Sequence, residues 1–570
     1  MQTRTMMKLV VAMSLGIAMT TAIHAQKAVE APKYGGTITV SSFYPTISSL
    51  GWDPADWNWK INVDNGYFQE QLLTGDLNKG LRGGGSEKFA NDSYLPKSVM
   101  RGELAESWQV LDNPLRAVFK LRKGIMWPAK EGVMASREFT ADDVVYAHNR
   151  LMKSAKADAS YMEFVKGIEA TDKHTVTYFL SKYHAEWDFR TGWGYYTSIM
   201  PKEVVEAPNG GATNWKNLVG TGPFQLMEFT SGSSATYSKN DSYWDKDKIA
   251  GKEYKIPFVD KVVLATVRDS QTRLASFRTG SIDVLLNAGW RDLTALGPIM
   301  DKVRIERRPA IQGLFLAMRN DQKPFDDVRV RKAMNMAIDK QSIVKNYYRG
   351  NAELINIPFS REFTEVFVPL DKQPPAIREL FEYNPEKAKK LLAEAGYPNG
   401  FEFKTQVSAN VNELVELAQL IAGFLAKVNV KMTVEPVEYA AFQSLMKTRK
   451  HGPGYLMTIG LTGPTASIDK QFITDRAWNT SLMSDPVVDK EFAQVLLERD
   501  NAKQVAKMKE LTNRIYANVP YVFLPVPDFF TIWWPWVKNY NGEIHLGGMR
   551  TGPIFARAWI DQEMKKKMGY

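Results

Sequence analysis

The stretch YNPEKAKKLLAEAGYPNGF, residues 383–401, carries a complete helix signal. Asn384 is a favourable N-cap, and Pro385 takes the first helical position, where its missing N–H costs nothing. Gly396 follows the last helical residues and Pro398 stands beyond it, as is typical of a helix end. The pattern predicts one helix with both its start and its stop defined.

Strand and helix patterns alternate on both sides of this helix. Residues 411–437 predict a long helix that feeds a strand, and residues 270–286 predict a helix that ends near Gly280 before a strand. Nearer the N-terminus, Thr140 is placed as an N-cap with Asp143 three residues later, close to a capping box. Because helices and strands alternate without segregating, the chain is predicted to be α/β.

Length and composition bound the class of protein. A chain of 570 residues exceeds what one hydrophobic core normally serves, so two or three domains are expected. Its 44% hydrophobic and 24% charged residues are typical of a globular protein, and the +10 charge is spread rather than concentrated as in a nucleic-acid binder. Cysteine is absent, which excludes disulfides, thiol nucleophiles, cysteine-ligated metals and a lipid on an N-terminal cysteine.

The first 25 residues resemble a secretory signal. Arg4 and Lys8 precede an apolar stretch at residues 9–22, and Ala25 is a small residue at a cleavage position. The apolar stretch is shorter than the about 20 residues needed to span a bilayer. The sequence therefore predicts a cleavable signal peptide at 1–25 and a mature protein in the periplasm.

Several stretches, in this order, resemble one known family. They are YGGTITV (34–40), WDPADW (52–57), GELAESWQV (102–110), FTADDVVYAHNR (139–150), GTGPF (220–224), LASFRTGSIDV (274–284), PFDDVRVRKAMNMAIDKQSIV (324–344) and NPEKAKKLLAEAGYPNG (384–400). The chain resembles the peptide/nickel-type extracellular solute-binding proteins of ABC importers, solute-binding family 5. The resemblance covers nearly all of the predicted mature chain.

This resemblance implies a two-lobed periplasmic binding protein fold with a hinge and an extra third domain. It places a discontinuous lobe I at 34–75, 186–308 and 519–570, the extra domain at 76–185 and lobe II at 309–518, with the chain crossing between lobes near Pro309 and Val519. The implied function is to capture an oligosaccharide or oligopeptide in the cleft and to deliver it to an inner-membrane ABC permease. A monomer that needs no cofactor or metal, binds no nucleic acid and is not an enzyme is expected.

The resemblance also gives an aromatic stretch a place beside the cleft. GWDPADWNWKIN, residues 51–62, holds Trp52, Trp57 and Trp59 and follows the predicted first strand. Packing inside the protein and contact with solute are equally weighted for these side chains, with Trp57 and Trp59 favoured over Trp52 to reach solute. The full set of candidate ligand-binding residues is Trp57, Trp59, Trp193, Tyr195, Trp290, Gly460 and Trp478.

An acidic residue that the resemblance would lead one to expect is missing. Peptide-binding members carry an aspartate a few residues before a proline in lobe II, which pairs with the α-ammonium group of the peptide. The corresponding stretch here, MTIGLTGPTASID (457–469), has no acid before Pro464, and none occurs between Glu438 and Asp469. A buried ammonium without a partner costs several kcal/mol. Peptides with a free N-terminus are therefore expected to bind poorly, and a neutral oligosaccharide to bind better.

Catalysis is the rival class of function for this sequence. The six histidines form no metal-binding spacing, the glycine-rich LRGGGSEK (81–88) lacks the pattern of a phosphate-binding loop, and no GxSxG motif occurs. Two carboxylates that meet only in space could still hydrolyse glycosides. A periplasmic glycosidase-like hydrolase with aromatic platforms is therefore the alternative.

Overall fold

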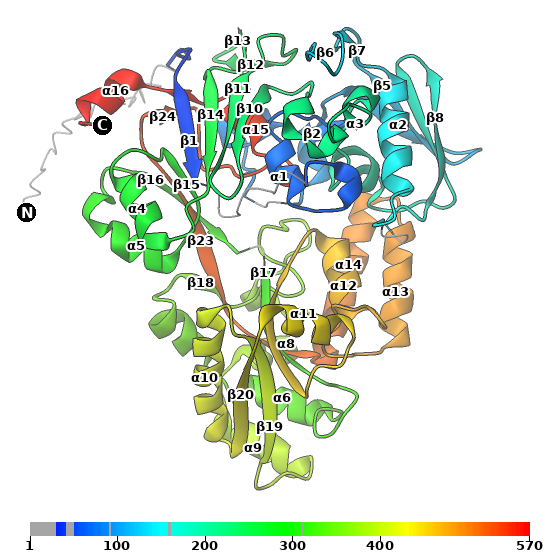
Figure 1. Ribbon diagram of the computed structural model, residues 1–570. Helices are drawn as coiled ribbons and strands as arrows, with labels where there is room; N and C mark the ends of the chain where they lie inside the picture. The colour runs from blue at the N-terminus through cyan, green and yellow to red at the C-terminus, as the bar shows by residue number, and fades with distance from the viewer. Residues whose placement is uncertain (1–29, 42–50, 91–92, 158–160, 311) are drawn as a thin grey trace, which may run out of the picture.

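The computed structural model describes residues 30–41, 51–90, 93–157, 161–310 and 312–570. It is an α/β protein with two lobes, one above the other in Figure 1, and a further domain beside the upper lobe. The predicted α/β class is confirmed. The signal segment 1–25 and part of the tract after the first strand, residues 42–50, lie outside the described residues, so the cleavable signal stays a prediction.

The upper lobe is built on an eight-stranded mixed sheet. β1 is parallel to β14 and β15, while β23 lies antiparallel between β15 and β16. The strands are β1 (Thr37–Ser41), β10 (Phe224–Thr230), β11 (Ser234–Lys239), β14 (Lys261–Ala265), β15 (Val284–Gly289), β16 (Arg304–Pro309), β18 (Ala352–Glu353) and β23 (Val526–Trp533). Helices α4 (Ser270–Arg278) and α5 (Trp290–Leu296) flank β15 in the chain, as the predicted helix–strand pattern at 270–286 requires.

The further domain has an antiparallel four-stranded sheet with one long helix beside it. Its strands run in the order β4 (Ala105–Leu111), β5 (Arg116–Leu121), β9 (Thr175–Leu180) and β8 (Val165–Asp172), and the helix is α2 (Ala141–Met152). Asp143 accepts a hydrogen bond from the Thr140 backbone N–H at 2.9 Å, which confirms the predicted cap of α2. The apolar side chains of this domain and of the upper lobe form one continuous core, so the two make a single upper half.

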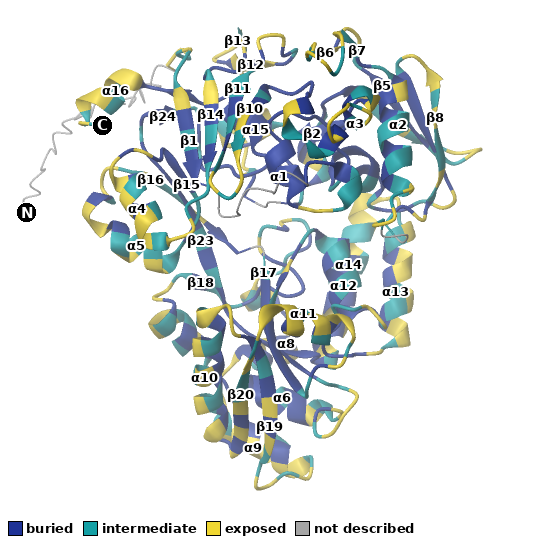
Figure 2. Ribbon diagram, viewed as in Figure 1, coloured by how far each residue is buried: buried dark blue, intermediate teal, exposed yellow. Residues whose placement is uncertain are grey.

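The lower lobe has a five-stranded sheet that is buried on both faces (Figure 2). Its strands, in order, are β20 (Val430–Val437), β19 (Phe401–Ser408), β21 (Gly454–Gly460), β17 (Gln312–Met318) and β22 (Tyr521–Phe523). Along β17 the side chains alternate between two cores, Leu314 and Leu316 on one face and Phe315 and Ala317 on the other, as strand geometry requires.

Helices cover each face of this lower sheet. One core includes side chains of α6 (Val328–Met336), α9 (Pro385–Glu394) and α10 (Asn412–Ala426), and the other includes those of α11 (Tyr439–Lys447), α12 (Pro464–Phe472), α13 (Pro486–Leu497) and α14 (Asn501–Asn518). The helix predicted after Asn384 is confirmed: the Asn384 side chain accepts from the Lys387 N–H at 3.0 Å, and Gly396 has a φ of +93°.

The chain passes between the two lobes at two neighbouring places. β16 ends in the upper sheet at Pro309 and β17 starts the lower sheet at Gln312, close to the first expected crossing. The second crossing lies between Phe523 and Val526, because β22 still pairs with β17 in the lower sheet. The expectation that the chain returns to lobe I at Val519 is therefore wrong by a few residues. The other domain limits stay predictions.

A buried ion pair joins distant segments of the upper half. Arg550 has no exposed surface, and its guanidinium contacts the carboxylate of Glu103 at 2.6 and 2.9 Å. The backbone carbonyl of Gln69 accepts a further bond from Arg550 at 3.1 Å. Glu70 lies beside this pair and accepts from the Trp244 indole at 3.0 Å. Burial, followed by repulsion from the Glu103 carboxylate, raises the pKa of Glu70 to about 8.

This raised pKa predicts a stability that falls with increasing pH. Folded Glu70 keeps its proton up to about pH 8, whereas in the unfolded chain it loses the proton near its ordinary pKa of 4.5. The free energy of unfolding contributed by this group is therefore fully present below that value and is lost as the pH rises through 8. Glu70→Gln should gain stability relative to the natural protein between about pH 5 and about pH 8 in urea titrations. Parallel stability–pH curves for the two proteins would contradict the assignment.

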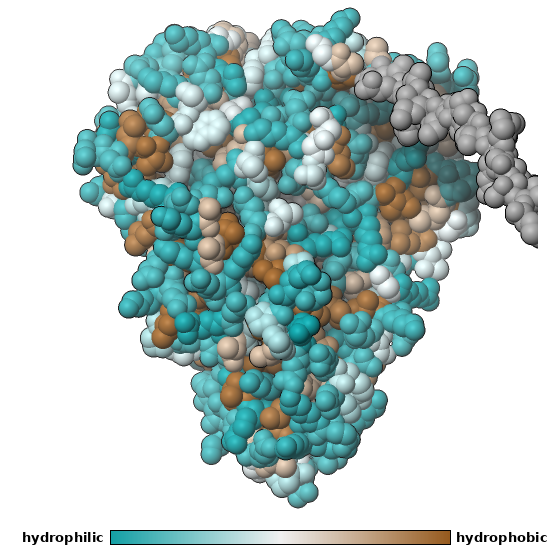
Figure 3. Space-filling view, turned by 180° about the vertical axis from the view of Figure 1, so that it is seen from behind, coloured by the Kyte–Doolittle hydropathy of each residue, from teal (hydrophilic) through white to brown (hydrophobic). Residues whose placement is uncertain are grey.

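Seen from behind, the surface is mainly hydrophilic, with apolar side chains in small separate patches (Figure 3). Within the described ranges, no helix is both long enough and apolar enough to cross a membrane. The same residues hold no group of three or more histidine, aspartate or glutamate side chains arranged to bind a metal ion.

Candidate functional site

A cavity of about 80 Å³ lies between the upper half and the lower lobe. Residues 94–97 and 185–193 line it from above, and residues 365–366, 462–465 and 501–508 line it from below. We call this cavity the interlobe pocket. Because both lobes contribute, a bound molecule would touch each of them.

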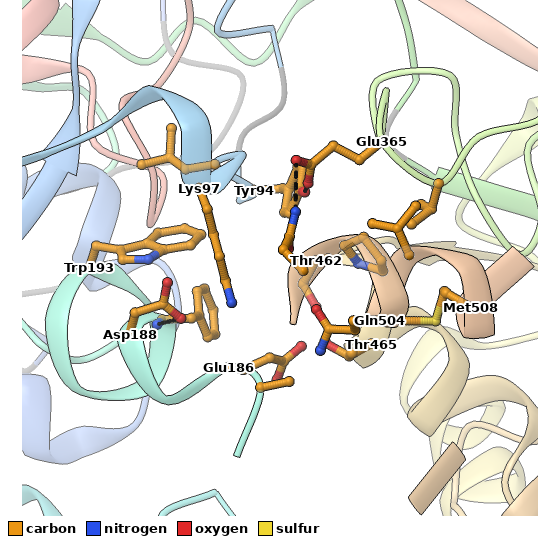
Figure 4. Close-up of a pocket in the computed structure, with 18 residues that line it drawn as sticks. Tyr94, Lys97, Glu186, Asp188, Trp193, Glu365, Thr462, Thr465, Gln504 and Met508 are labelled. Atoms are coloured by element: carbon orange, nitrogen blue, oxygen red, sulfur yellow. Dashed lines mark hydrogen bonds between the residues drawn. The ribbon is translucent and has the colours of Figure 1, made fainter. Parts of the chain in front are cut away.

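Direct contacts between the lobes enclose the interlobe pocket. The Tyr94 hydroxyl donates to the Glu365 carboxylate at 2.8 Å across the cavity wall (Figure 4). The Ala185 N–H donates to the Leu496 carbonyl at 2.9 Å, and Arg499 forms a two-pronged ion pair with Asp112 at 2.9 and 3.0 Å. The structure is therefore that of the closed arrangement of the two lobes.

Trp193 forms part of the upper wall of the pocket. It ends the short helical turn η5 (Phe189–Trp193), and the glycines of the 547–548 loop pack against it. A Cβ atom on Gly547 would lie 2.6 Å from Leu95 and 2.8 Å from the Trp193 ring, so this close approach needs glycine. The Trp193 indole N–H has no hydrogen-bond partner among the described residues. The N–H is itself buried, so it is the part of the ring that lines the cavity, rather than the N–H, that a bound molecule could contact.

Four charged side chains line the same cavity: Lys97, Glu186, Asp188 and Glu365. Glu186 is paired with Arg190 at 3.0 Å, and Glu365 accepts the hydrogen bond from Tyr94. In Figure 4 the side chain of Lys97 extends into the cavity toward Asp188 and Glu186. Neither Lys97 nor Asp188 forms an ion pair in the part of the chain that the structure describes, although both border one cavity.

Asp188 is the most deeply buried of these charged groups. Only 4% of its surface is exposed, and its carboxylate accepts one hydrogen bond, from the Phe189 N–H at 3.0 Å. Burial raises the pKa of the Asp188 carboxyl, and the charge of Lys97 opposes this shift. A desolvated carboxylate with so few partners is costly to keep charged, so a cation entering the pocket would gain by pairing with it.

Of the residues expected from sequence to bind solute, the structure places Trp193 in the pocket wall. Tyr195 lies close by, with its hydroxyl 2.6 Å from the Ser93 hydroxyl, but it does not line the cavity. Gly460 ends β21, and the loop that follows contributes Thr462 to the lining. These three candidates are therefore brought to one region.

The tryptophans of residues 51–62 do not line the interlobe pocket. Trp52 is fully buried in the upper core against Phe229. Trp57 packs on Tyr161 and Tyr196, with ring centroids 5.4 and 4.8 Å apart, and its N–H donates to a carbonyl of α2. Trp59 is 40% exposed. For Trp52 and Trp57 the structure favours the packing interpretation over contact with solute.

The last two candidates lie apart from the pocket. Trp290 starts α5 and packs against Tyr347 and Tyr348, with Arg291 over its ring at 4.9 Å. It therefore belongs to a second contact between the lobes. Trp478 is partly buried against one core of the lower lobe. Their roles in binding remain predictions.

The packing of Trp57 leads to a testable prediction. Trp57→Ala should lower the free energy of unfolding by about 2–4 kcal/mol, since it removes a ring that joins the upper lobe to α2. Its effect on solute affinity should be small, because the ring is not part of the pocket wall. Chemical unfolding and calorimetric titration would measure the two effects, with the more exposed Trp59→Ala as the matched variant. A Trp57→Ala protein of unchanged stability and weakened binding would show the opposite role.

The missing acid in the stretch 457–469 has a different consequence from the one expected. The loop after Gly460 does border the pocket and carries no carboxylate. However, Glu186, Asp188 and Glu365 reach the same cavity from other segments. The inference that the cleft offers an ammonium group no acidic partner is therefore wrong, because the sequence comparison considered one loop only.

Sequence reasoning missed the charged residues of the site. Glu186 and Asp188 stand in HAEWDFRTGWGYY (184–196), a stretch in which only Trp193 and Tyr195 were selected. Two acids next to so many aromatic residues were a usable signal. Lys97 and Glu365 gave none, since their proximity to Asp188 arises only from the folded chain.

Comparison with known proteins gives the family. The family model described as bacterial extracellular solute-binding proteins, family 5 (middle), matches residues 99–478, more than half of the chain. The chain belongs to this family. The resemblance noted from the sequence is thereby confirmed, and the proteins of known function or structure that the chain matches are binding proteins rather than enzymes. The hydrolase alternative receives no support from them.

Individual members are similar over much of their length. Heme-binding protein A of Haemophilus influenzae is 28% identical over 63% of this chain and 65% of its own, just under two thirds of that relative. The dipeptide-binding protein of Escherichia coli is 28% identical over 65% of this chain and 69% of its own. A periplasmic binding protein of Helicobacter pylori, solved with the peptide STSA, shares the fold at a TM-score of 0.71 with 22% identity, covering 93% of this chain and 99% of that one.

Proposed function

We propose that this family 5 protein is the periplasmic solute-binding component of an ABC importer, which captures a short oligomeric solute in the interlobe pocket and delivers it to an inner-membrane permease. The observation that carries the proposal is the pocket itself, whose wall is divided between two lobes joined by two chain crossings. Contacts to both lobes exist only when the lobes are closed, so a solute bound there would stabilise closure.

The favoured solute is a short peptide with a free amino group. Asp188 is a buried carboxylate without an ion pair among the described residues, and it lies in the same wall as the Trp193 ring. A ligand ammonium group would supply the charge partner that Asp188 lacks, and charge-assisted hydrogen bonds of this kind are the strong ones. Relatives whose names refer to dipeptides and to di- and tripeptides agree with this choice.

An oligosaccharide, the solute preferred from sequence, has weaker support. The Trp193 ring could stack on a sugar, but a neutral sugar would leave the charge of Asp188 unpaired in a closed pocket. The tryptophans that motivated the sugar, Trp57 and Trp59, do not line the cavity.

A thermal-shift comparison separates the two solute classes. Trialanine, N-acetyl-trialanine and maltotriose would be added to the purified protein at equal concentrations. A solute present at about 100 times its dissociation constant should add about 2.7 kcal/mol of stability. We expect trialanine to raise the melting temperature and its N-acetyl derivative to raise it much less. A shift with maltotriose alone would overturn the peptide assignment and leave the binding function in place.

Closure on solute gives a second expected result. Solution scattering should show a smaller radius of gyration with saturating trialanine than without it, because ligand shifts the population toward the closed arrangement described here. The closed arrangement itself is held by few polar contacts, of which Arg499–Asp112 is exposed and therefore weak. An unchanged scattering profile under conditions where calorimetry detects binding would contradict closure.

A further inference from the structure

Asp528 lies beside both places where the chain crosses between the lobes. It stands near the start of β23, just after the second crossing, and β23 runs across the junction of the lobes in Figure 1. In the pairing of β16 with β23, Asp528 is opposite Pro309, the last residue of β16 before the first crossing. A rotation of the lobes about these crossings therefore acts on the surroundings of Asp528.

The Asp528 carboxylate is fully buried in the closed arrangement. Its Oδ2 atom accepts hydrogen bonds from the Arg307 guanidinium at 2.5 and 2.7 Å. Its Oδ1 atom has no hydrogen-bond partner among the described residues. Because a buried carboxylate oxygen without a donor is costly, this environment favours the protonated carboxyl group. Burial accordingly raises the pKa of Asp528 to about 6, although the charge of Arg307 opposes the shift.

Two further charged side chains act on Asp528 from β18 and the loop after it. The carboxylate of Glu353 raises the pKa of Asp528 and the guanidinium of Arg361 lowers it, and these two groups pair with each other at 2.8 Å. Arg308 lies over the ring of Phe529 at 5.4 Å, on the opposite face of β23, because successive side chains of a strand alternate. Arg307 is therefore the main charge that opposes the effect of burial.

Both lobes contribute to the cover over Asp528. Arg307 belongs to the upper sheet, and its guanidinium donates to the Gly350 carbonyl at 3.1 Å. The Asp528 N–H donates to the Asn351 carbonyl at 2.9 Å. These two carbonyls belong to residues 343–352, a segment with apolar side chains in a core of the lower lobe. Opening the lobes would move this segment relative to β16, which would hydrate the carboxylate and lower its pKa toward the ordinary 3.8.

We propose that Asp528 is a proton-sensitive element of the hinge, which favours closure of the interlobe pocket when the surroundings become more acidic. The inference rests on the proposed function, in which solute binds the closed arrangement. The raised pKa in the closed arrangement gives a contribution to closure that is fully present below the ordinary value of 3.8 and is lost as the pH rises through about 6. Because apparent affinity follows the fraction of binding-competent protein, solute binding should report on this contribution.

Trialanine affinity at pH 7 and pH 5 tests this coupling, with Asp528→Asn as the variant that cannot ionise. We expect the affinity of the natural protein, relative to that of Asp528→Asn, to be about 3- to 10-fold higher at pH 5 than at pH 7. One group with a closed-state pKa near 6 gives at most about tenfold over this range. Comparing the two proteins at each pH removes the effects of other titrating groups, such as Asp188, which both share. Calorimetric titration measures the affinities.

Variants of Arg307 show whether the pH effect belongs to Asp528, and they do not depend on the folding of Asp528→Asn. Arg307→Met removes the cation that lowers the pKa of Asp528, so the change in affinity should move to higher pH. Arg307→Lys keeps a cation and should leave the midpoint near pH 6. Asp475→Asn is the matched control, because it removes a carboxylate from an exposed pair with Arg449 outside the pocket. Its affinity relative to the natural protein should not vary with pH.

Solution scattering without solute separates the hinge from the choice of ligand. When the pH falls from 7 to 5, the radius of gyration of the natural protein should decrease more than that of Asp528→Asn. If trialanine binds neither protein, the peptide assignment fails and the scattering comparison alone decides the role of Asp528. A relative affinity that does not change with pH, or an equal response of the two proteins in scattering, would overturn the proposal.

Discussion

Asp188→Asn is expected to weaken the binding of trialanine by about 30- to 1,000-fold, or about 2–4 kcal/mol, since truncating one partner of a buried charge pair has effects of this size. The substitution keeps the shape of the side chain and removes only its charge. In the protein without solute the same change should leave stability unchanged or raise it, because a desolvated carboxylate with one hydrogen bond is replaced by a neutral amide. Lower affinity for trialanine together with undiminished stability of the Asp188→Asn protein is the result expected if Asp188 pairs with the ammonium group of the solute.

The control for this variant is Asp241→Asn. Asp241 is highly exposed, lies 3.7 Å from the Lys239 ammonium in a loose ion pair, and does not line the pocket. The Asp241→Asn substitution removes the same charge from the protein and should leave trialanine binding unchanged. If Asp188→Asn binds trialanine as tightly as the natural protein, or if both variants weaken binding equally, Asp188 is not the ammonium partner.

Arg550→Met is expected to cost about 3–5 kcal/mol of unfolding free energy, the usual effect of removing one member of a buried ion pair. The change leaves the Glu103 carboxylate in the core, beside Glu70, without its guanidinium partner. It also loosens the turn at residues 547–550, in which the Arg550 N–H donates to the Gly547 carbonyl at 3.1 Å. Because Gly547 packs against Trp193, solute affinity should fall as well.

Two further proteins show whether the effect belongs to the buried pair. The double variant Arg550→Met with Glu103→Leu removes both charges and should recover much of the lost stability, since apolar replacement of a whole buried pair is often neutral. Arg514→Met breaks an exposed pair with Glu491, whose atoms lie 2.9 Å apart, and should cost far less. Urea unfolding measures all of them. An Arg550→Met protein as stable as Arg514→Met would show that the buried pair contributes little.

The sequence predicted local structure well where the signal was itself local. Asn384, Pro385 and Gly396 define a helix through backbone groups a few residues apart, and the structure confirms that helix. The second crossing between lobes was misplaced because nothing in residues 519–523 indicates which sheet a short apolar strand joins. That is decided by pairing with β17, some 200 residues away in the chain.

The candidate site could be predicted only in part, for the same reason. Trp193 was selected as one aromatic residue among several, whereas Trp57 was selected for an unusual local composition and proved to pack beside α2. Lys97, Asp188 and Glu365 become neighbours only when three distant segments meet. A count of acids within one loop could not reveal that other segments supply carboxylates to the same cavity.

A crystal structure of the protein with trialanine bound tests the central claim most directly. The account predicts the peptide inside the interlobe pocket, with its ammonium group within hydrogen-bond distance of the Asp188 carboxylate and its chain against the Trp193 ring, while the lobes keep the Tyr94–Glu365 contact. Peptide bound elsewhere on the protein, or in the pocket with its ammonium group turned away from Asp188, would contradict it.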